Sequence, residues 1–322
     1  MTEILVKVEN LETTFFTKLG PIKAVDGISF EIAKGKTLGI VGESGCGKSV
    51  TSFSIMGLLE SPGRVTGGSV RVRDLDLTKS TEKQMQDIRG NIVSMIFQEP
   101  MTALNPVLRI GYQLDEPIIK HMKLSAAEAR ERSIEMLHLV GIPSPSERYL
   151  AYPHELSGGM RQRAMIAMAL ACNPEYLIAD EPTTALDVTV QAQILELMRD
   201  LQDKFKMSIQ LITHDLGVVS EMADNVLVMY AGVACEQGSI DDIFSYPLHP
   251  YTRALMNSIP KFGARVKRLP TIPGTVPSPL DLPRGCPFQN RCSNVIEQCR
   301  IERPKMTELR PQHFVACYNP QA

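Results

Sequence analysis

The chain has 322 residues, enough for one large domain and a smaller one. Hydrophobic residues make up 43% and charged residues 22%, a mixture typical of soluble globular proteins. The 34 basic and 36 acidic residues leave a formal charge of −2, which disfavours a protein that holds nucleic acid mainly by neutralising its phosphates.

The first predicted element is a strand, because Ile4, Val6 and Val8 alternate with other residues. This pattern does not resemble a secretory signal. The longest apolar run, residues 164–172, is far short of the roughly 20 residues that cross a bilayer. With seven cysteines and no export signal, we expect reduced thiols, so metal ligation competes with disulfides.

Further along the chain, short apolar runs alternate with helical patterns such as residues 190–205. The runs are nearly continuous, as in strands that are covered on both faces, and the alternation indicates a parallel α/β sheet. The strongest strand candidates are residues 37–42, 92–97, 176–180, 208–213 and 226–230.

Two segments depart from this alternation. Residues 100–156 have helical patterns and no good strand, so we expect a helical insertion there. After residue 258 the chain becomes rich in Pro and Gly, which indicates an irregular extension over residues 259–322.

The stretch GESGCGKS fits the phosphate-loop pattern G-x-x-x-x-G-K-[ST] and lies between a predicted strand and a predicted helix. Glycines allow backbone N–H groups to converge on phosphate oxygens, and the helix N-terminus adds positive potential. Lys48 is expected to reach the β and γ phosphates of ATP, and the Ser49 hydroxyl to ligate Mg²⁺. An ordinary Gly-rich turn is the alternative, which the Lys-Ser pair disfavours. The predicted nucleotide-binding residues are Gly42, Glu43, Ser44, Gly45, Cys46, Gly47, Lys48 and Ser49.

An acidic pair follows the apolar strand of residues 176–180, about 130 residues after this loop. Asp180 can hold the Mg²⁺ shell, and Glu181 can orient and polarise the attacking water. Alone, such a pair could be only the charge at a helix start. After a phosphate loop, and on its own buried strand, it predicts a nucleotide-hydrolysing site.

The stretch ELSGGMRQRAMIAMALACNPEYLIADEPTTALD, followed by THD at 213–215, resembles the ATP-binding-cassette ATPases in motif order and spacing. The resemblance covers about the first 260 residues. The remainder, with HPYTRAL, PGTVP and four cysteines, looks like the ATP-binding subunits of bacterial dipeptide and oligopeptide importers. The resemblance implies an α/β fold: a RecA-like P-loop core with an antiparallel N-terminal β subdomain, a helical insertion and a small irregular Cys-rich C-terminal extension. It also implies an ATPase domain over residues 1–258.

Individual roles follow from the matching motifs. Ser157 stands at a predicted helix N-cap, which is an anion site by its own physics. The family implies that Ser157, Gly158 and Gly159 bind the γ-phosphate of an ATP held by a second ATPase subunit. Met160 replaces the glutamine most common in this signature. Gln98 is expected to sense the γ-phosphate, His214 to act as the switch histidine and Asp187 to couple the two sites. Phe15 or Phe16 could stack on adenine. The implied catalytic residues are Glu181, His214, Gln98 and Lys48, and the implied Mg²⁺ ligands are Ser49, Gln98 and Asp180.

The four C-terminal cysteines, spaced C-x5-C-x6-C-x17-C, have competing interpretations. Disulfides are disfavoured in a protein that needs cytosolic ATP. A Zn²⁺ site fits the count, although zinc ligands usually come in tighter pairs. A 4Fe-4S cluster spans wider spacings, and the importer resemblance favours it over zinc or unligated thiols. The expected ligands are Cys286, Cys292, Cys299 and Cys317.

The implied function is an ATP-hydrolysing subunit that powers import of dipeptides or oligopeptides. It would lie peripherally at the cytoplasmic face of the cell membrane, with a second homologous ATPase, two transmembrane permeases and an extracytoplasmic peptide-binding protein, and would bind no nucleic acid. The alternative is a soluble cassette ATPase of DNA repair or translation. That alternative is disfavoured because the chain has neither a long coiled-coil insertion nor a second cassette.

Overall fold

The computed structural model describes residues 3–184, 186–258 and 271–321. The chain forms two compact units, each of which is assembled from several segments. The first unit comprises Met1–Val6, Ile32–Lys36 and Lys79–Ile212, and the second comprises Lys7–Glu31, Thr37–Thr78 and Thr213–Ala322.

The first unit contains three parallel strands in the order β8-β7-β6. It also contains the helices α2 to α8. The strands are β6 (Val93–Ile96), β7 (Tyr176–Asp180) and β8 (Ser208–Ile212). The helices are α2 (Glu82–Ile88), α3 (Pro100–Ala103), α4 (Ile110–Pro117), α5 (Ala126–Leu139), α6 (Pro145–Leu150), α7 (Gly158–Leu170) and α8 (Val188–Phe205), with single turns η2 (Ile118–Met122) and η3 (Pro153–Glu155).

Every residue of β6, β7 and β8 is buried, which explains why their sequences are nearly continuous apolar runs. Ile178 of β7 is the register partner of Gln210 in β8. The Gln210 side chain is satisfied inside this layer, because its Oε1 accepts a hydrogen bond of 2.5 Å from the Tyr176 hydroxyl. The parallel α/β core predicted from the apolar runs is confirmed.

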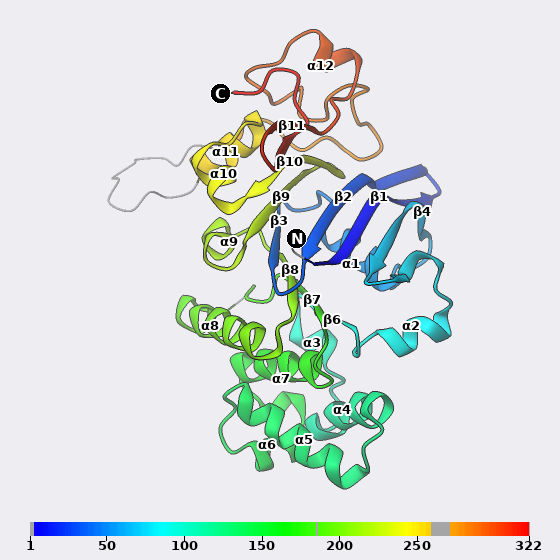
Figure 1. Cartoon of the computed structure of the whole chain (residues 1–322), viewed down its shortest axis with the longest axis vertical. Helices are drawn as coiled ribbons and strands as arrows, with labels where there is room; N and C mark the ends of the chain where they lie inside the picture. The colour runs from blue at the N-terminus through cyan, green and yellow to red at the C-terminus, as the bar shows by residue number, and fades with distance from the viewer. Residues whose placement is uncertain (1–2, 185, 259–270, 322) are drawn as a thin grey trace. The chain divides into compact units, whose positions relative to one another are not determined.

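The helical insertion of the first unit is joined by one carboxylate. Asp115 of α4 accepts hydrogen bonds from the Ser133 hydroxyl of α5 at 2.5 Å and from the Tyr149 hydroxyl of α6 at 2.5 Å. Burial and the bond to Asp115 raise the pKa of Tyr149 to about 12, so this phenol stays a donor at physiological pH. Helix α5 starts at a capping box formed by Ser125 and Glu128. These contacts hold α4, α5 and α6 as one body (Figure 1).

The second unit contains two sheets. One has the order β2-β1-β4-β5, and β4 and β5 in it are antiparallel. The other has the order β11-β12-β10-β9-β3, with β3 and β9 parallel and the remaining pairs antiparallel. The strands are β1 (Ile4–Thr17), β2 (Gly20–Ala33), β3 (Thr37–Val41), β4 (Gly63–Val72), β5 (Leu75–Asp76), β9 (Asn225–Tyr230), β10 (Val233–Ser239), β11 (Thr307–Arg310) and β12 (His313–Val315). The first residues of β1, up to Val6, and the last residues of β2, from Ile32, belong to the first unit. Its helices are α1 (Lys48–Met56), α9 (Leu216–Met222), α10 (Ile240–Ser245), α11 (Pro250–Ser258) and α12 (Gln298–Ile301), and η1 (Leu77–Lys79) begins in this unit.

The C-terminal segment is mostly irregular, but it adds two strands to the sheet of the second unit. Strand β12 pairs with β10, where Glu236 is the register partner of Val315. The fully buried carboxylate of Glu236 lies 2.7 Å from His313 Nε2 and accepts hydrogen bonds from the backbone N–H groups of Leu248 and His249. This carboxylate therefore joins β10, β12 and the start of α11.

The prediction that a metal ion or a 4Fe-4S cluster holds this segment is wrong. Among the described residues, no group of three or more His, Cys, Asp or Glu side chains could hold a metal ion. Cys286 and Cys299 are instead buried in an apolar cluster that includes Tyr230, Tyr251 and Phe288. Burial raises the pKa of Cys286 and of Cys317 to about 11, so both thiols are protonated at neutral pH. The four thiols Cys286, Cys292, Cys299 and Cys317 are all free in the structure.

The C-terminal segment is stabilised by sharing the core of the second unit. Phe288 is 2% exposed and contacts the rings of Tyr230 and Tyr251 at centroid distances of 5.2 and 5.3 Å. Aromatic rings dominate core energetics because of the large area that they bury. The C-terminal segment therefore shares an apolar core with β9 and α11.

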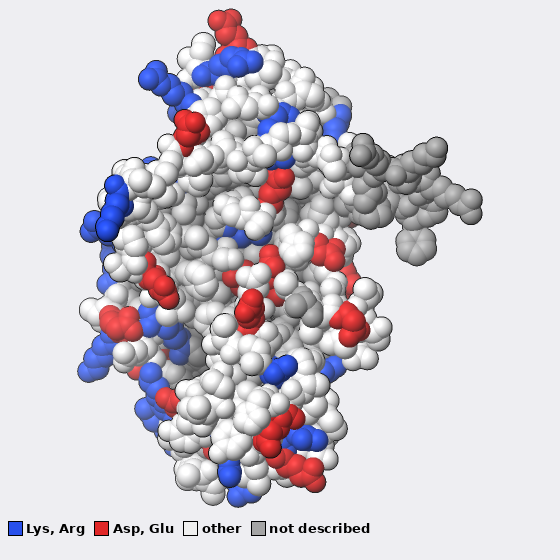
Figure 2. Space-filling view, turned by 180° about the vertical axis from the view of Figure 1, so that it is seen from behind, with Lys and Arg blue, Asp and Glu red and all other residues white. Residues whose placement is uncertain are grey.

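In the described part of the chain, none of the helices has the length and apolarity that crossing a bilayer requires. On the face shown in Figure 2, basic and acidic side chains are interspersed among uncharged ones. The charges on this face are therefore mixed, as the nearly balanced composition implies.

The pH dependence of unfolding tests the buried ring of His249. Its Nδ1 accepts a hydrogen bond of 3.0 Å from the Tyr251 N–H, and burial lowers its pKa from 6.5 to about 4. Below pH 6.5 the His249 ring is protonated in the unfolded chain, whereas in the native state it stays neutral down to about pH 4. Between pH 6.5 and pH 4, this group should remove about 3 kcal/mol of stability.

The matched variant is His249→Asn, because an asparagine Oδ1 can accept the same N–H but does not titrate. Its free energy of urea unfolding should be lower than that of the wild type at pH 7.5, and the difference should shrink as the pH falls to 4. A difference that stays constant with pH would contradict the neutral buried ring.

Candidate functional site

The phosphate loop of the second unit leads from the buried strand β3 to the N-terminus of α1 (Figure 1). Two of its glycines approach other backbone segments closely. A Cβ on Gly42 would come within 2.2 Å of the Met229 carbonyl oxygen, and a Cβ on Gly47 within 2.4 Å of the Ala24 carbonyl oxygen. Gly47 also has a φ of 101°, which side chains rarely adopt. These positions require glycine, so the loop path is fixed by its backbone contacts.

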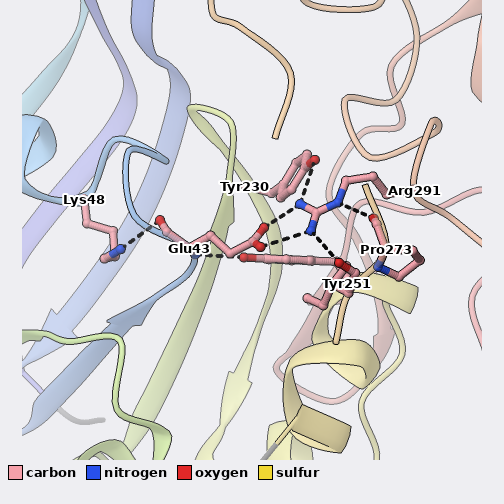
Figure 3. A network of polar contacts seen from close by, with 7 residues as sticks. Glu43, Lys48, Tyr230, Tyr251, Pro273 and Arg291 are labelled. Carbon is pink, nitrogen blue, oxygen red and sulfur yellow. Dashed lines mark hydrogen bonds and ion pairs between the residues drawn. The ribbon is translucent and has the colours of Figure 1, made fainter. Parts of the chain in front are cut away.

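Lys48 lies inside this loop and is 6% exposed. Its Nζ donates to the Gly42 carbonyl at 2.7 Å and to the Glu43 carbonyl at 3.1 Å, as Figure 3 shows in part. Lys48 and Ser49 are the first two residues of α1, so both side chains lie at a helix N-terminus. A buried ammonium group at a helix N-terminus can bind phosphate oxygens.

The thiol of Cys46 is 1% exposed and lies 3.8 Å from Lys48 Nζ. Burial raises its pKa, and the nearby ammonium group only partly offsets this effect. The thiol is therefore protonated at neutral pH and unreactive.

Two further predicted residues lie in the second unit. His214 is exposed and stands between Thr213, whose N–H bonds to the Ile40 carbonyl of β3 at 3.4 Å, and Asp215, which caps α9. Phe15 is partly buried, and its ring would lie within 2.6 Å of a Cβ on Gly63. Phe16 is exposed, and the guanidinium carbon of Arg64 lies 4.2 Å from the centroid of its ring.

The first unit brings two of the predicted residues into direct contact. The Gln98 Nε2 donates to Glu181 Oε2 at 2.9 Å, and the Thr184 hydroxyl donates to the same oxygen at 2.8 Å. Glu181 has a φ of 48°, and its N–H bonds to the Ile212 carbonyl at 2.8 Å. This strained backbone is held by neighbouring contacts, as is common at functional positions. Asp180, the last residue of β7, is 2% exposed.

Two helix N-termini in the first unit carry the remaining predicted residues. The Ser157 hydroxyl caps α7 by accepting a hydrogen bond of 3.3 Å from the Met160 N–H. The Asp187 carboxylate caps α8, because its Oδ1 accepts hydrogen bonds of 3.1 and 3.0 Å from the N–H groups of Thr189 and Val190. Ser157 and Gly158 are exposed, and a Cβ on Gly158 would meet nothing within 4 Å. The start of α7 is therefore open to an incoming anion.

The predicted residues fall into both units. Gly42–Ser49, Phe15 and His214 belong to the second, whereas Gln98, Asp180, Glu181, Ser157, Gly158, Gly159 and Asp187 belong to the first. Sequence reasoning missed Thr184, although a hydroxyl three residues after a strand-end carboxylate is a usable signal. It also missed Gln162, whose Nε2 bonds to the Pro182 carbonyl beside Glu181, and Arg291, which no motif marked.

Comparisons with known proteins agree with these features. Residues 25–184 match the family model of the ABC transporter, and residues 235–299 match that of the oligopeptide/dipeptide transporter C-terminal region. The oligopeptide transport ATP-binding protein AppD of Bacillus subtilis is 54% identical, over 98% of this chain and 96% of its own length. The dipeptide transport ATP-binding protein DppD of Escherichia coli is 47% identical, over 98% of this chain and 97% of its own length.

Solved structures show the same fold. The ATP-binding cassette MJ0796, in a dimeric post-hydrolysis state bound to ADP and phosphate, is similar with a TM-score of 0.66 and 27% identity. The similarity covers 73% of this chain and 98% of that one. The cassette cbiO1 of Clostridium perfringens has a TM-score of 0.63 and covers 76% of this chain. The predicted fold is therefore confirmed for its cassette part.

Substitution of two loop glycines tests the fixed path of the loop. Gly47→Ala should destabilise the protein by at least about 2 kcal/mol and abolish ATP binding, because its Cβ collides with the Ala24 carbonyl. Gly45→Ala is the matched control, since nothing lies within 4 Å of its Cβ and only the positive φ of 78° is strained. It should cost about 1 kcal/mol and retain binding. Thermal melting and titration with a fluorescent ATP analogue check both values, and equal effects of the two variants would contradict the close approach at Gly47.

Proposed function

Because the chain belongs to the ATP-binding-cassette transporter ATPases, we propose that it powers the import of dipeptides or oligopeptides through a membrane transporter. The cassette makes it an ATPase that uses ATP with Mg²⁺. The observation that carries the peptide cargo is the match of residues 235–299 to the oligopeptide/dipeptide transporter C-terminal region. We divide the chain into a nucleotide-binding part, residues 1–258, and an importer extension, residues 259–322, of which 259–270 lie outside the described residues.

In this proposal the phosphate loop binds the triphosphate of ATP. Backbone N–H groups of residues 42–49 converge on phosphate oxygens, and Lys48 transfers its hydrogen bonds from loop carbonyls to the β and γ phosphates. Phe15 stacks on the adenine. The Ser49 hydroxyl at the start of α1, the buried Asp180 carboxylate and Gln98 are oxygen donors of the kind that Mg²⁺ prefers. Mg²⁺ neutralises charge that develops on the phosphates.

Glu181 acts on the attacking water. Its Oε2 is held by Gln98 and Thr184, so the carboxylate has a defined orientation and a second oxygen to polarise the water. Gln98 touches Glu181 directly and can therefore report the state of the γ-phosphate to the helical segment that follows it. His214 donates to the γ-phosphate. Hydrolysis is then mostly positioning and charge stabilisation of an in-line attack.

The exposed N-terminus of α7 serves a second subunit. Ser157, Gly158 and Gly159 bind the γ-phosphate of an ATP held by a homologous ATPase, and Asp187 couples the two sites. The open surroundings of Gly158 support this role. The dimeric state of the similar cassette MJ0796 supports the same arrangement.

Two permease subunits and an extracytoplasmic peptide-binding protein complete the proposed transporter, with this chain peripheral at the cytoplasmic face. The helical segment, residues 100–156, presents large apolar side chains that are 36–75% exposed. We propose that these exposed apolar side chains contact the permeases. The exposed apolar set is Met101, Val107, Tyr112, Ile119, Met122 and Leu150. A role in DNA repair or translation has no comparable support, because the C-terminal match is to peptide transporters.

The substitution Glu181→Gln tests hydrolysis. A glutamine keeps an oxygen for Gln98 and Thr184 but loses the negative charge, so ATP binding should persist while kcat falls at least about 100-fold. Closed, ATP-bound pairs of ATPase subunits should accumulate. The control Glu196→Gln changes an exposed carboxylate on α8. ATPase and peptide-uptake assays in proteoliposomes check both variants, and near wild-type turnover with Glu181→Gln would refute the role.

A charge placed in the exposed apolar set tests the permease contact. The double variant Val107→Asp, Tyr112→Asp should bind ATP normally but lower peptide uptake about tenfold, because it places charge in an apolar interface. Leu19→Asp is the control, since Leu19 is 83% exposed in the turn between β1 and β2. Equal uptake by the two variants would contradict a permease interface in this segment.

A further inference from the structure

A single arginine of the C-terminal segment contacts the phosphate loop. Arg291 lies 248 residues after Glu43, and its side chain is only 4% exposed. Its two terminal nitrogens donate to the two Glu43 carboxylate oxygens at 2.6 and 3.0 Å (Figure 3). Such a bidentate pair fixes both distance and orientation.

The Arg291 guanidinium is itself held from several sides. Its Nε donates to the Pro273 carbonyl at 2.9 Å, and a terminal nitrogen donates to the Ile272 carbonyl at 3.3 Å. The Tyr230 hydroxyl accepts at 3.4 Å, and the ring of Tyr230 lies 5.8 Å from the guanidinium carbon. The bond to Glu43 is the main cause of a raised pKa for Arg291. The C-terminal segment thus presents a rigid cation to the loop.

Glu43 transmits this contact to the residues that bind phosphate. It is the first variable residue of the loop, directly after Gly42. Its backbone N–H donates to the Tyr251 hydroxyl at 2.9 Å, and its carbonyl accepts from Lys48 Nζ at 3.1 Å. A shift of residue 43 would therefore displace an N–H at the start of the loop and an acceptor of the lysine.

A second region of the C-terminal segment borders the same loop. A cavity of about 320 Å³ is lined by Ser44 and Gly45 of the loop and by Val276 and Pro277 of the segment. The segment therefore flanks the loop beyond the ion pair.

The charge of Glu43 gives the ion pair a second consequence. A carboxylate at the entrance of a loop that binds a triphosphate would repel it. The Arg291 guanidinium, whose side chain is 4% exposed, neutralises that carboxylate, whose side chain is 29% exposed. The pair therefore removes a repulsion as well as fixing the backbone.

We propose that Arg291 is a positioning residue for ATP binding, through which the C-terminal segment sets the affinity of the phosphate loop for nucleotide. This inference rests on the proposed ATP-binding role of residues 42–49. By thermodynamic linkage, ATP binding should in turn favour the docked state of the segment around residue 291.

The first test is Arg291→Ala in the full chain, with Arg303→Ala as the matched control. Arg303 is also in the C-terminal segment, but its guanidinium forms an ion pair of 2.5 Å with Asp26 of β2 and not with a carboxylate of the phosphate loop. Arg291→Ala should raise the Kd for a fluorescent ATP analogue about tenfold. In the assembled transporter it should raise KM by the same factor and leave kcat within about twofold, because it acts on binding and not on the chemical step. Arg303→Ala should leave Kd, KM and kcat within about twofold of wild type.

Hydrogen–deuterium exchange provides a readout that does not depend on activity. In nucleotide-free protein, the amides of residues 42–49 should exchange faster in Arg291→Ala than in wild type or Arg303→Ala. A lower melting temperature with unchanged Kd and unchanged exchange of these amides would show a merely structural role and overturn the inference.

A milder variant keeps the test decisive if Arg291→Ala does not fold. Arg291→Lys retains the positive charge but cannot donate to both Glu43 oxygens, so Kd should rise about threefold. An unchanged Kd for a folded Arg291→Lys would overturn the bidentate positioning. If the wild-type chain itself failed to bind ATP, the proposed function would fail, and this result is distinct from a failure of the Arg291 inference alone.

Discussion

The proposed ATP chemistry depends first on the fixed path of the phosphate loop. Gly42 and Gly47 bring the loop backbone against the carbonyls of Met229 and Ala24, where no side chain would fit. The buried Lys48 then has its ammonium group held by loop carbonyls. Binding a triphosphate needs donors that are already in place, because the cost of ordering them would otherwise reduce affinity.

The residues proposed to act in hydrolysis are also held in place by their neighbours. Glu181 has an unfavourable φ, and its carboxylate is oriented by Gln98 and Thr184. Since Gln98 immediately precedes the helical segment with the exposed apolar set, one hydrogen bond connects the hydrolytic carboxylate to the part proposed to meet the permeases. This hydrogen bond is therefore a short physical link between the proposed hydrolytic residue and the proposed permease surface.

The sequence predicted the parts of the protein that depend on local pattern. The apolar runs located β3, β6, β7, β8 and β9, and the loop and strand-end carboxylates were recognised by residue type and spacing. Contacts between distant residues were not predictable. Nothing in the spacing links Arg291 to Glu43, and β12 is only three residues long. The number and spacing of the cysteines led to a wrong prediction, because neither shows whether a thiol is buried. In the structure, Cys286 and Cys299 lie in an apolar core.

In the proposed transporter, ATP hydrolysis by this chain is coupled to peptide import. The most direct measurement is the ATPase rate of the assembled transporter in proteoliposomes, with and without a peptide-loaded binding protein, together with uptake of labelled peptide. Peptide should stimulate hydrolysis, and labelled peptide should accumulate only when ATP is present. Hydrolysis that is indifferent to peptide and accompanied by no uptake would contradict this coupling.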